Sequence, residues 1–397
     1  MPLQKQIKKL ASEYTAEITS VRRHLHEYPE LSFQEYQTAK FVAEKLRQYG
    51  IEPTEGVATT GLTALIEGKN SSKKVVALRA DMDALPIKEA NEVPYKSKNE
   101  GIMHACGHDV HTASLLGAAK ILHEIKDQFE GTVKLIFQPG EERFPGGASL
   151  MIKDGVLEDP VPSSILGLHV MPYLDVGKVG FREGMYMASA DEIYITVKGK
   201  GGHAATPHLN IDPVIIASHI MVALQQIVSR QANPNIPSVL SFGKVIAEGA
   251  TNIIPDEVKI EGTFRTLNEP WRKEAKLQME RMAESIAVSM GGSCDFKILD
   301  GYPYLENHPE LTRRAKNNAI KYLGRGNVED LDIWMAGEDF SYFSHRIDAS
   351  FYRLGVRNES KGITSSVHTP TFDIDERALG VGAGLMAWLA VNELSSN

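Results

Sequence analysis

The sequence predicts an α/β fold in which a discontinuous, mixed-sheet domain is interrupted by a smaller α+β domain. With 397 residues the chain is too long for one ordinary hydrophobic core, so two domains are expected. Strand-like and helix-like segments alternate in 1–186 and again in 301–397, which is typical of α/β domains with mainly parallel sheets. The intervening residues 187–300 instead follow the order strand, helix, strand, strand, helix, strand.

The first part of the chain has clear helix and strand patterns. Apolar residues recur at helical spacing in two N-terminal stretches, and Gly50 is placed to cap the second. The predicted helices are 17–27, 34–49 and 110–125. The predicted strands are 62–67, 75–79, 131–137 and 165–170. The last two strands are almost continuously apolar, as strands buried on both faces of a parallel sheet are.

Polar residues gather where these predicted strands end. They are Asp81, Asp83, Glu141, Glu142 and His169. Sites in open α/β sheets lie at the carboxyl ends of the strands, so these side chains are expected to share one edge of the sheet.

The middle of the chain has a different texture. Its predicted strands are 191–198, 238–245, 258–264 and 294–299, and its predicted helices are 211–230 and 269–290. This order resembles a ferredoxin-like sandwich. After residue 301 the helix and strand texture of the first part returns, and the chain closes with an apolar helix at 377–392.

Composition narrows the classes of partner. The net charge is −8 and there is no basic cluster, which argues against nucleic acid or anionic membranes. No signal peptide is expected, since the first fourteen residues lack an apolar core, and the longest apolar stretch, 379–391, is too short to span a bilayer. Two cysteines cannot form a disulfide framework, so a reducing, cytoplasmic location is expected.

Residues 104–111 concentrate potential metal ligands. This octapeptide, His-Ala-Cys-Gly-His-Asp-Val-His, holds three of the thirteen histidines and one of the two cysteines. A lone cysteine or histidine is more often structural than a ligand. Cys106 and His108 are different, because they are one residue apart on a loop that feeds a helix, with Gly107 and Asp109 beside them. This pattern favours a metal site, of which one loop supplies only a part.

Glu141 and Glu142 form the second constellation, directly after Pro139-Gly140 and an apolar strand. Taken alone, they read equally well as an exposed loop pair. Beside a metal, the two carboxylates would have different roles. One carboxylate would bind the ion, and its neighbour would take a proton from the attacking water.

Other catalytic motifs are excluded. The run Gly199 to Ala204 fits G-x-G-x-x-A, but Pro207 interrupts the helix that should follow and 218–232 contains no acidic residue. The chain has no Walker A, G-x-S-x-G or H-E-x-x-H motif. Nucleotide-binding, serine-hydrolase and zincin interpretations therefore fall away.

Taken together, the motifs resemble the M20 metallopeptidase family, in particular its amidohydrolase branch. That branch includes hippurate hydrolases, N-acyl-L-amino acid amidohydrolases, N-acetyldiaminopimelate deacetylases and auxin-conjugate hydrolases. The resemblance covers most of the chain, in the segments 22–31, 78–86, 103–111, 137–142, 167–169, 199–208, 252–256 and 337–340.

The resemblance implies a metal-dependent amidohydrolase that cleaves N-acyl amino acids (acetyl, benzoyl or similar) to a carboxylic acid and a free amino acid. Glu141 falls on the general base of the family. The implied metal ligands are Cys106, His108, Glu142, His169 and His368. Five ligands are too few for two separate four-coordinate ions, so two ions would share a bridge, for which Cys106 is the candidate. Thiolate and imidazole favour Mn, Zn, Ni or Co over Mg or Ca.

The inserted segment 187–300 is implied to be a lid and dimerisation domain of a homodimer or homotetramer. Within it, His203 would stabilise the oxyanion, and Asn252 and Arg265 would bind the substrate carboxylate. The sequence departs slightly from the family pattern, since Gly140 replaces an alanine before the glutamate pair and 369–373 differs from the usual segment.

Alternatives of other classes stay open. A dipeptidase or an N-acetyldiaminopimelate-type deacetylase would use the same residues, and an inactive relative would bind a metal or a peptide without turnover. Asp81 and Asp83 read equally well as residues that orient ligands and as caps of a turn. His104 and His111 are expected to be solvated or to lie behind the ligands.

Overall fold

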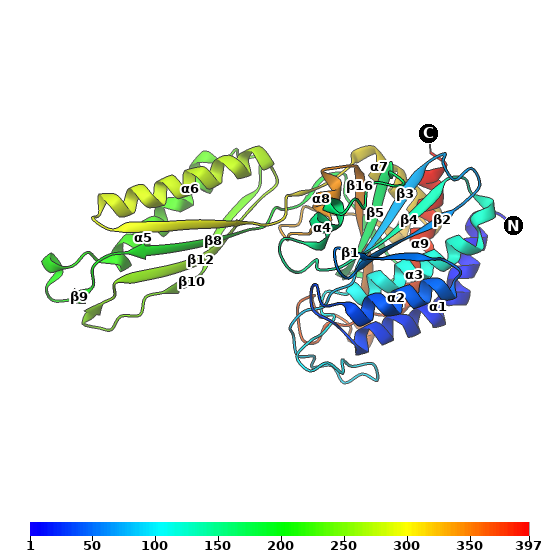
Figure 1. The fold of residues 1–397 in the computed structure, drawn as a ribbon, viewed down its shortest axis with the longest axis horizontal. Coiled ribbons are helices and arrows are strands. Elements are labelled where there is room, and N and C mark those ends of the chain that lie inside the picture. The colour runs from blue at the N-terminus through cyan, green and yellow to red at the C-terminus, as the bar shows by residue number, and fades with distance from the viewer. Residues whose placement is uncertain (397) are drawn as a thin grey trace. The chain divides into compact units, whose positions relative to one another are not determined.

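The computed structural model describes residues 1–396, which form two compact units. Unit 1 consists of residues 1–184, 306–333 and 339–396, and unit 2 of residues 185–305 and 334–338. The division is visible in Figure 1, where the green and yellow middle of the chain forms a body of its own.

The elements of unit 1 are as follows. Its helices are α1 Leu3–Glu27, α2 Tyr36–Gln48, α3 His108–Glu124, α4 Gly147–Lys153, α7 Pro309–Leu323, α8 Ser341–Ser344 and α9 Arg377–Leu394. The strands of its sheet are β1 Pro53–Val57, β2 Gly61–Glu67, β3 Val75–Asp81, β4 Thr132–Gln138, β5 Ser164–Asp175, β6 Val179–Phe181, β15 Val328–Asp330 and β16 Asp348–Arg357.

The sheet of unit 1 is mixed, in the order β1-β2-β4-β3-β5-β16-β6-β15. Strands β4, β3, β5 and β16 run parallel to their neighbours in the centre, whereas β1-β2, β2-β4 and β16-β6 are antiparallel. Every residue of β3 and β4 is buried, which fits their continuous apolar sequence. The prediction of a mixed α/β sheet is therefore confirmed.

Helices α3 and α9 pack on this sheet and against each other, and α1 lies over both (Figure 1). Nearly all of α3 is buried, because it contacts strands on one side and other helices on the other. The N-terminus of α3, at His108, is consequently held against the sheet by packing along the whole helix.

Unit 2 is a four-stranded antiparallel sheet with two long helices. Its strands lie in the order β10-β12-β8-β13, with bounds Ser238–Ile246, Glu257–Thr266, Asp191–Lys198 and Ser293–Asp300. Helices α5 (Pro213–Gln226) and α6 (Glu269–Ser289) both pack on this sheet and on each other (Figure 1). Shorter strands of unit 2 are β9 Gly202–His203 and β11 Ile253–Ile254. Strands β7 Gly184–Met187 and β14 Leu305–Asn307, which pair with each other, lie where the chain passes from one unit to the other.

Helix α5 continues as a π-helical turn, Ile227–Gln231. The combined stretch Pro213–Gln231 is long and apolar enough to cross a membrane by length and composition, with 33% of it buried. Its buried residues, among them Ile216 and Ile220, belong to the core of unit 2. An amphipathic helix covering a sheet accounts for this pattern.

Most predicted elements are found within a few residues of their predicted bounds. Helix α1 begins at Leu3 instead of residue 17, because Ile7 and Ala11 continue its buried face despite the lysines between them. The sequence interpretation assigned no strand to β16, although it lies in the middle of the sheet. Strand β5 runs on to Asp175, so the prediction that a strand ends at His169 is wrong.

Candidate metal centre

The sheet of unit 1 places the ends of β3 and β4 beside the middle of β5. Strand β3 ends at Asp81, which lies opposite Gln138, the last residue of β4. In the pairing of β3 with β5, Arg79 lies opposite Gly167, so His169 stands level with Asp81. Residues that follow β3 and β4 therefore reach the same region as a side chain from within β5.

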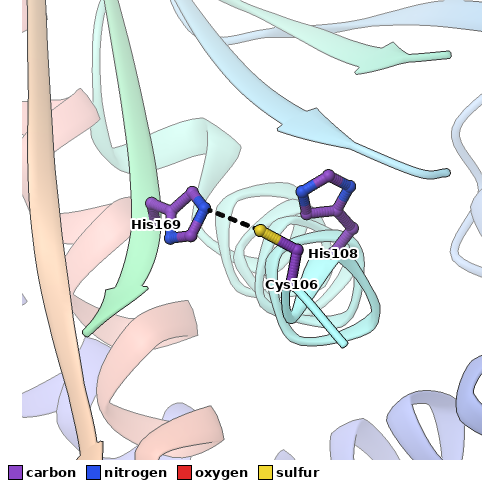
Figure 2. Close-up of side chains that lie close together, drawn as sticks. All are labelled: Cys106, His108 and His169. Carbon is purple, nitrogen blue, oxygen red and sulfur yellow. Dashed lines mark hydrogen bonds between the residues drawn. The ribbon is translucent and has the colours of Figure 1, made fainter. Parts of the chain in front are cut away.

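The turn before α3 presents Cys106 and His108 to this region (Figure 2). Gly107, between them, has φ +85° and is the N-cap of the helix. A Cβ at this position would lie 2.6 Å from a methyl group of Val170, on β5. Glycine is thus needed both for the left-handed conformation and for the close approach of the loop to the sheet.

The five predicted ligands lie together. The Sγ of Cys106 is 3.4 Å from Nε2 of His169 and 3.3 Å from Nε2 of His368. His368 Nε2 is also 3.1 Å from a carboxylate oxygen of Glu142, and His108 Nε2 is 4.0 Å from the same oxygen. Donors that share one tetrahedral ion at about 2.0–2.3 Å stand roughly 3.3–3.8 Å apart, so these separations fit metal coordination.

The donors form two overlapping groups. Cys106, His108 and His169 offer ligand atoms within 4.8 Å of one another, and so do Cys106, Glu142 and His368. The thiol of Cys106 belongs to both groups.

The electrostatics of the cluster also fit a cation. Burial disfavours the charged imidazolium of His108, but the carboxylates of Asp81 and Asp83 outweigh this penalty and raise the pKa of His108 to about 10. Its Nε2 is buried without a hydrogen-bond partner among the described residues. A pocket that holds a proton so firmly on a buried imidazole also favours a metal ion in its place.

The thiol leads to the same conclusion. Burial, reinforced by the carboxylates of Glu142 and Glu141, raises the pKa of Cys106 well above its ordinary value. A thiolate is therefore unfavourable here unless a cation compensates its charge. The donor set of one thiol, three imidazoles and one carboxylate suits a transition-metal ion or Zn²⁺ better than Mg²⁺ or Ca²⁺.

Residues behind the ligands orient the imidazoles. Asp83 Oδ1 lies 3.1 Å from Nδ1 of His108, which leaves Nε2 for a metal. His169 donates its Nδ1 proton to the carbonyl of Val170 at 2.8 Å, so its Nε2 lone pair faces Cys106. The contact of Asp83 with His108 is of the kind that orients a metal-ligating imidazole.

His111 is engaged on both ring nitrogens. Its Nε2 accepts the backbone N–H of Val170 at 2.9 Å, so Nδ1 carries the proton and donates it to Asp81. His111 is thus buried beside the predicted ligands and is not solvated. His104 is buried with no hydrogen-bond partner for either ring nitrogen among residues 1–396, and burial lowers its pKa to about 4.

A buried ion network supports the site from the sheet side. The guanidinium of Arg79 binds Asp81 at 2.6 Å and Asp339 at 2.8 Å, and Asp339 also accepts from Gln138. The sequence alone assigned no role to Arg79, Gln138 or Asp339, although a charged arginine within an otherwise apolar strand is a signal that could have identified Arg79. A second network joins Arg22 and His26 of α1 to Asp109 of α3, at 2.8 and 2.7 Å.

Glu141 adjoins the donor cluster. The side chain is 6% exposed, and its Oε2 lies 4.0 Å from His108 Nε2. Its carboxylate and the ligand atoms of His108 and Glu142 all lie within 4.8 Å of one another. This position is close enough for a carboxylate to exchange a proton with a ligand bound at the cluster.

The remaining predicted site residues belong to unit 2. His203, on β9, is exposed and pairs with Ile253 of β11, next to Asn252. Its Nδ1 accepts from the N–H of Ala205 at 3.0 Å, which leaves Nε2 to donate. Arg265 lies on β12, where burial lowers the pKa of its guanidinium.

Residues 77–392 match peptidase family M20/M25/M40. The YhaA protein of Bacillus subtilis (strain 168) is 41% identical, and the match covers 98% of each chain. The thermostable carboxypeptidase 2 of Saccharolobus solfataricus is also 41% identical, over 98% of this chain and 99% of its own. The N-acyl-L-amino acid amidohydrolase of Geobacillus stearothermophilus is 42% identical over 81% of this chain and 86% of its own.

Solved structures agree with this assignment. A protein of methicillin-resistant Staphylococcus aureus superposes with a TM-score of 0.90 and 35% identity, over 98% of this chain and 100% of that one. The YXEP protein of Bacillus subtilis, described as a dinuclear metal binding peptidase from the M20 family, superposes with a TM-score of 0.82 and 36% identity, over 97% and 100%. The chain therefore belongs to peptidase family M20/M25/M40, as its motifs indicated, and it is a metal-dependent hydrolase of amide bonds.

Proposed function

We propose that this hydrolase cleaves N-acyl amino acids, such as N-acetyl and N-benzoyl amino acids, to a carboxylic acid and a free amino acid. The observation that carries the proposal is the buried carboxylate of Glu141 beside a cluster of five metal-ligand side chains. The 42% identity to a protein named N-acyl-L-amino acid amidohydrolase supports the substrate class.

In this proposal Cys106, His108, Glu142, His169 and His368 would hold two divalent ions, and Mn, Zn, Ni and Co suit this set. When bound, the ions supply Lewis acidity, which polarises the amide carbonyl and acidifies the attacking water. Glu141 takes the proton of that water and passes it to the leaving nitrogen.

Unit 2 acts as a ferredoxin-like lid and dimerisation domain, corresponding to the predicted domain 187–300, while 1–186 and 301–397 form the catalytic domain. Its His203 donates to the developing oxyanion. Arg265, whose guanidinium forms no hydrogen bond or ion pair with the described residues, and Asn252 bind the substrate carboxylate.

Exposed apolar side chains on unit 2 support a homodimer or homotetramer. Val222 and Ile215 of α5 are 75% and 50% exposed, and β10 is an edge strand that exposes Val245. Both cysteines are unpaired, in keeping with a reducing, cytoplasmic environment.

A substrate screen tests the proposal. Enzyme loaded separately with Mn, Zn, Ni and Co is assayed on N-acetyl amino acids, N-benzoyl amino acids and dipeptides. Faster turnover of N-acyl amino acids is expected. Preference for dipeptides would favour the peptidase alternative, which the 41% identity to a carboxypeptidase supports. Absence of hydrolysis with every metal would favour an inactive, binding relative.

The variant Glu141→Gln tests the base. It keeps the size of the side chain and removes its basicity, so turnover is expected to fall by about two to four orders of magnitude while metal content is unchanged. Near-normal turnover in a metal-loaded variant would contradict the role of Glu141.

A further inference from the structure

Glu35 is a buried glutamate at the start of α2, but its side chain does not cap that helix. It stands at the N-cap of α2 and is 0% exposed, yet its side chain makes no capping hydrogen bond to that helix. The first N–H groups of α2 are instead bound by Glu30, whose carboxylate accepts from Gln37 at 3.2 Å and Thr38 at 2.8 Å. The Glu35 carboxylate is therefore free of helix capping and serves other partners.

The partners of Glu35 lead to the catalytic loop. One carboxylate oxygen accepts the N–H of Phe33 at 2.9 Å and the N–H of Gly140 at 2.8 Å. The other accepts the hydroxyl of Thr60 at 2.6 Å. Gly140 directly precedes Glu141, so Glu35 holds the N–H of the residue before the proposed base, which belongs to the Pro139–Gly140 peptide group.

The peptide group on the other side of Glu141 is held in the same way. The N–H of Glu142 donates to Asp83 Oδ2 at 2.9 Å, and that oxygen also accepts the hydroxyl of Ser32 at 2.6 Å. The N–H groups of both sequence neighbours of Glu141, Gly140 and Glu142, thus end on buried carboxylates. We call residues 32–35 the brace segment. Glu35 carries one of these carboxylates, and Ser32 donates a hydrogen bond to the other, that of Asp83.

Steric contact reinforces the hydrogen bonds. Gly140 has φ +59°, and a Cβ at this position would lie 2.4 Å from the ring of Phe33. Phe33 itself has φ +64°, a conformation that costs a non-glycine residue about 1 kcal/mol or more and persists only when its surroundings impose it. The aromatic ring therefore rests directly on the backbone of the loop that carries Glu141.

We propose that the brace segment positions Glu141 for catalysis, with Glu35 as its positioning residue. This inference rests on the proposed role of Glu141 as the base. Positioning requires a side-chain oxygen that accepts the N–H groups of Phe33 and Gly140, and the carboxyl group that supplies it here brings the penalty of a buried charge when it is ionised. That penalty is visible, because burial and the nearby carboxylate of Asp83 raise the pKa of Glu35 to about 7.

The test compares two glutamates near the start of α2. Glu35 accepts the N–H of Gly140, whereas Glu30 accepts an N–H of α2 itself, that of Thr38. In metal-loaded enzyme, Glu35→Ala releases Gly140, whereas Glu30→Ala weakens only the start of α2. Glu35→Ala is expected to lower kcat about 10- to 100-fold with little change in KM or metal content, because sub-ångström displacements of a base have effects of this size. Glu30→Ala is expected to lower Tm while kcat stays near the wild-type value.

Two further variants keep the test decisive if Glu35→Ala does not fold. Glu35→Gln retains an oxygen for both N–H groups and is expected to recover most of kcat. Glu35→Asp retains the charge but is too short to reach Gly140, so it is expected to lose kcat. Wild-type kcat in Glu35→Asp or Glu35→Ala would overturn the positioning role, as would an equal loss of kcat in Glu30→Ala.

The outcome is separable from that of the proposed function. Loss of turnover in Glu141→Gln together with normal turnover in the Glu35 variants would overturn only the brace. Normal turnover in Glu141→Gln would instead overturn the proposed base.

Discussion

Replacing Glu35 by glutamine is expected to make the protein more stable relative to the wild type as the pH rises. In the wild type, burial and the Asp83 carboxylate raise the pKa of Glu35 to about 7 in the folded state. In the unfolded chain a glutamate has a pKa of about 4.3–4.5. The folded protein therefore binds more protons than the unfolded chain between these values, and its free energy of unfolding falls as the pH rises through this range.

The size of the effect follows from the two pKa values. Each pKa unit corresponds to about 1.4 kcal/mol, so the ionised carboxylate costs the folded state about 3 kcal/mol above pH 7 and almost nothing below pH 4.5. Glutamine carries no such penalty. Glutamine also changes the acceptor of the hydrogen bonds from Phe33, Gly140 and Thr60. The part of this change that depends on pH is already contained in the pKa of Glu35, because these hydrogen bonds favour the ionised carboxyl.

Urea unfolding at several pH values between 5 and 8.5 measures the difference. The free energy of unfolding of Glu35→Gln minus that of the wild type is expected to rise by about 2–3 kcal/mol across this range. Chelator-treated protein gives the clearest result, because a bound cation would favour the Glu35 carboxylate. Parallel curves for the two proteins would refute the reasoning, since they would show that Glu35 titrates alike in the folded and unfolded states.

Three further predictions concern the metal centre and its loop. Cys106→Ala is expected to lower metal content per subunit in elemental analysis, and unchanged stoichiometry would exclude it as a ligand. Metal binding to chelator-treated protein at pH 8 is expected to release at least one proton per subunit in calorimetry across several buffers, because the pKa of His108 is about 10 without metal; buffer-independent heats would contradict this. Gly140→Ala is expected to destabilise the protein by about 1–3 kcal/mol through its clash with Phe33, and the loss should shrink in the double variant with Phe33→Ala; additive losses would show that the ring does not cause it.

Glu35 and Phe33 lower the stability of the folded protein next to the proposed base, Glu141. An ionised, buried glutamate in a loop brace is a poor choice for stability alone, and the left-handed Phe33 adds to the strain. Both residues act on Gly140, the residue before Glu141, because Glu35 accepts its N–H and the ring of Phe33 occupies the space that a Cβ there would need. Enzymes commonly give up stability where a reacting group must be held in place.

Local patterns predicted much of the fold. Continuous apolar runs located β3, β4 and β5, and helical periodicity located α3, α6 and α9. Strand β16 was not predicted although it is nearly all buried, because its small and polar residues, such as Ser350 and Gly355, interrupt the apolar pattern. Its place in the sheet depends on pairing with β5, which lies far away in the sequence.

The sequence by itself determined the family, the metal-ligand residue types and the position of the glutamate pair. Those features are carried by short motifs, such as Cys106-Gly107-His108 and Glu141-Glu142, whose chemistry can be read without knowing what lies beside them. Only the tertiary structure decided which residues hold them in place. Glu35 and Gly140 are 105 positions apart, and Arg79 and Asp339 are 260 apart. Hydrogen bonds act over about 3 Å whatever the separation along the chain, so partners of this kind become identifiable only when the sheet and its helices bring them together.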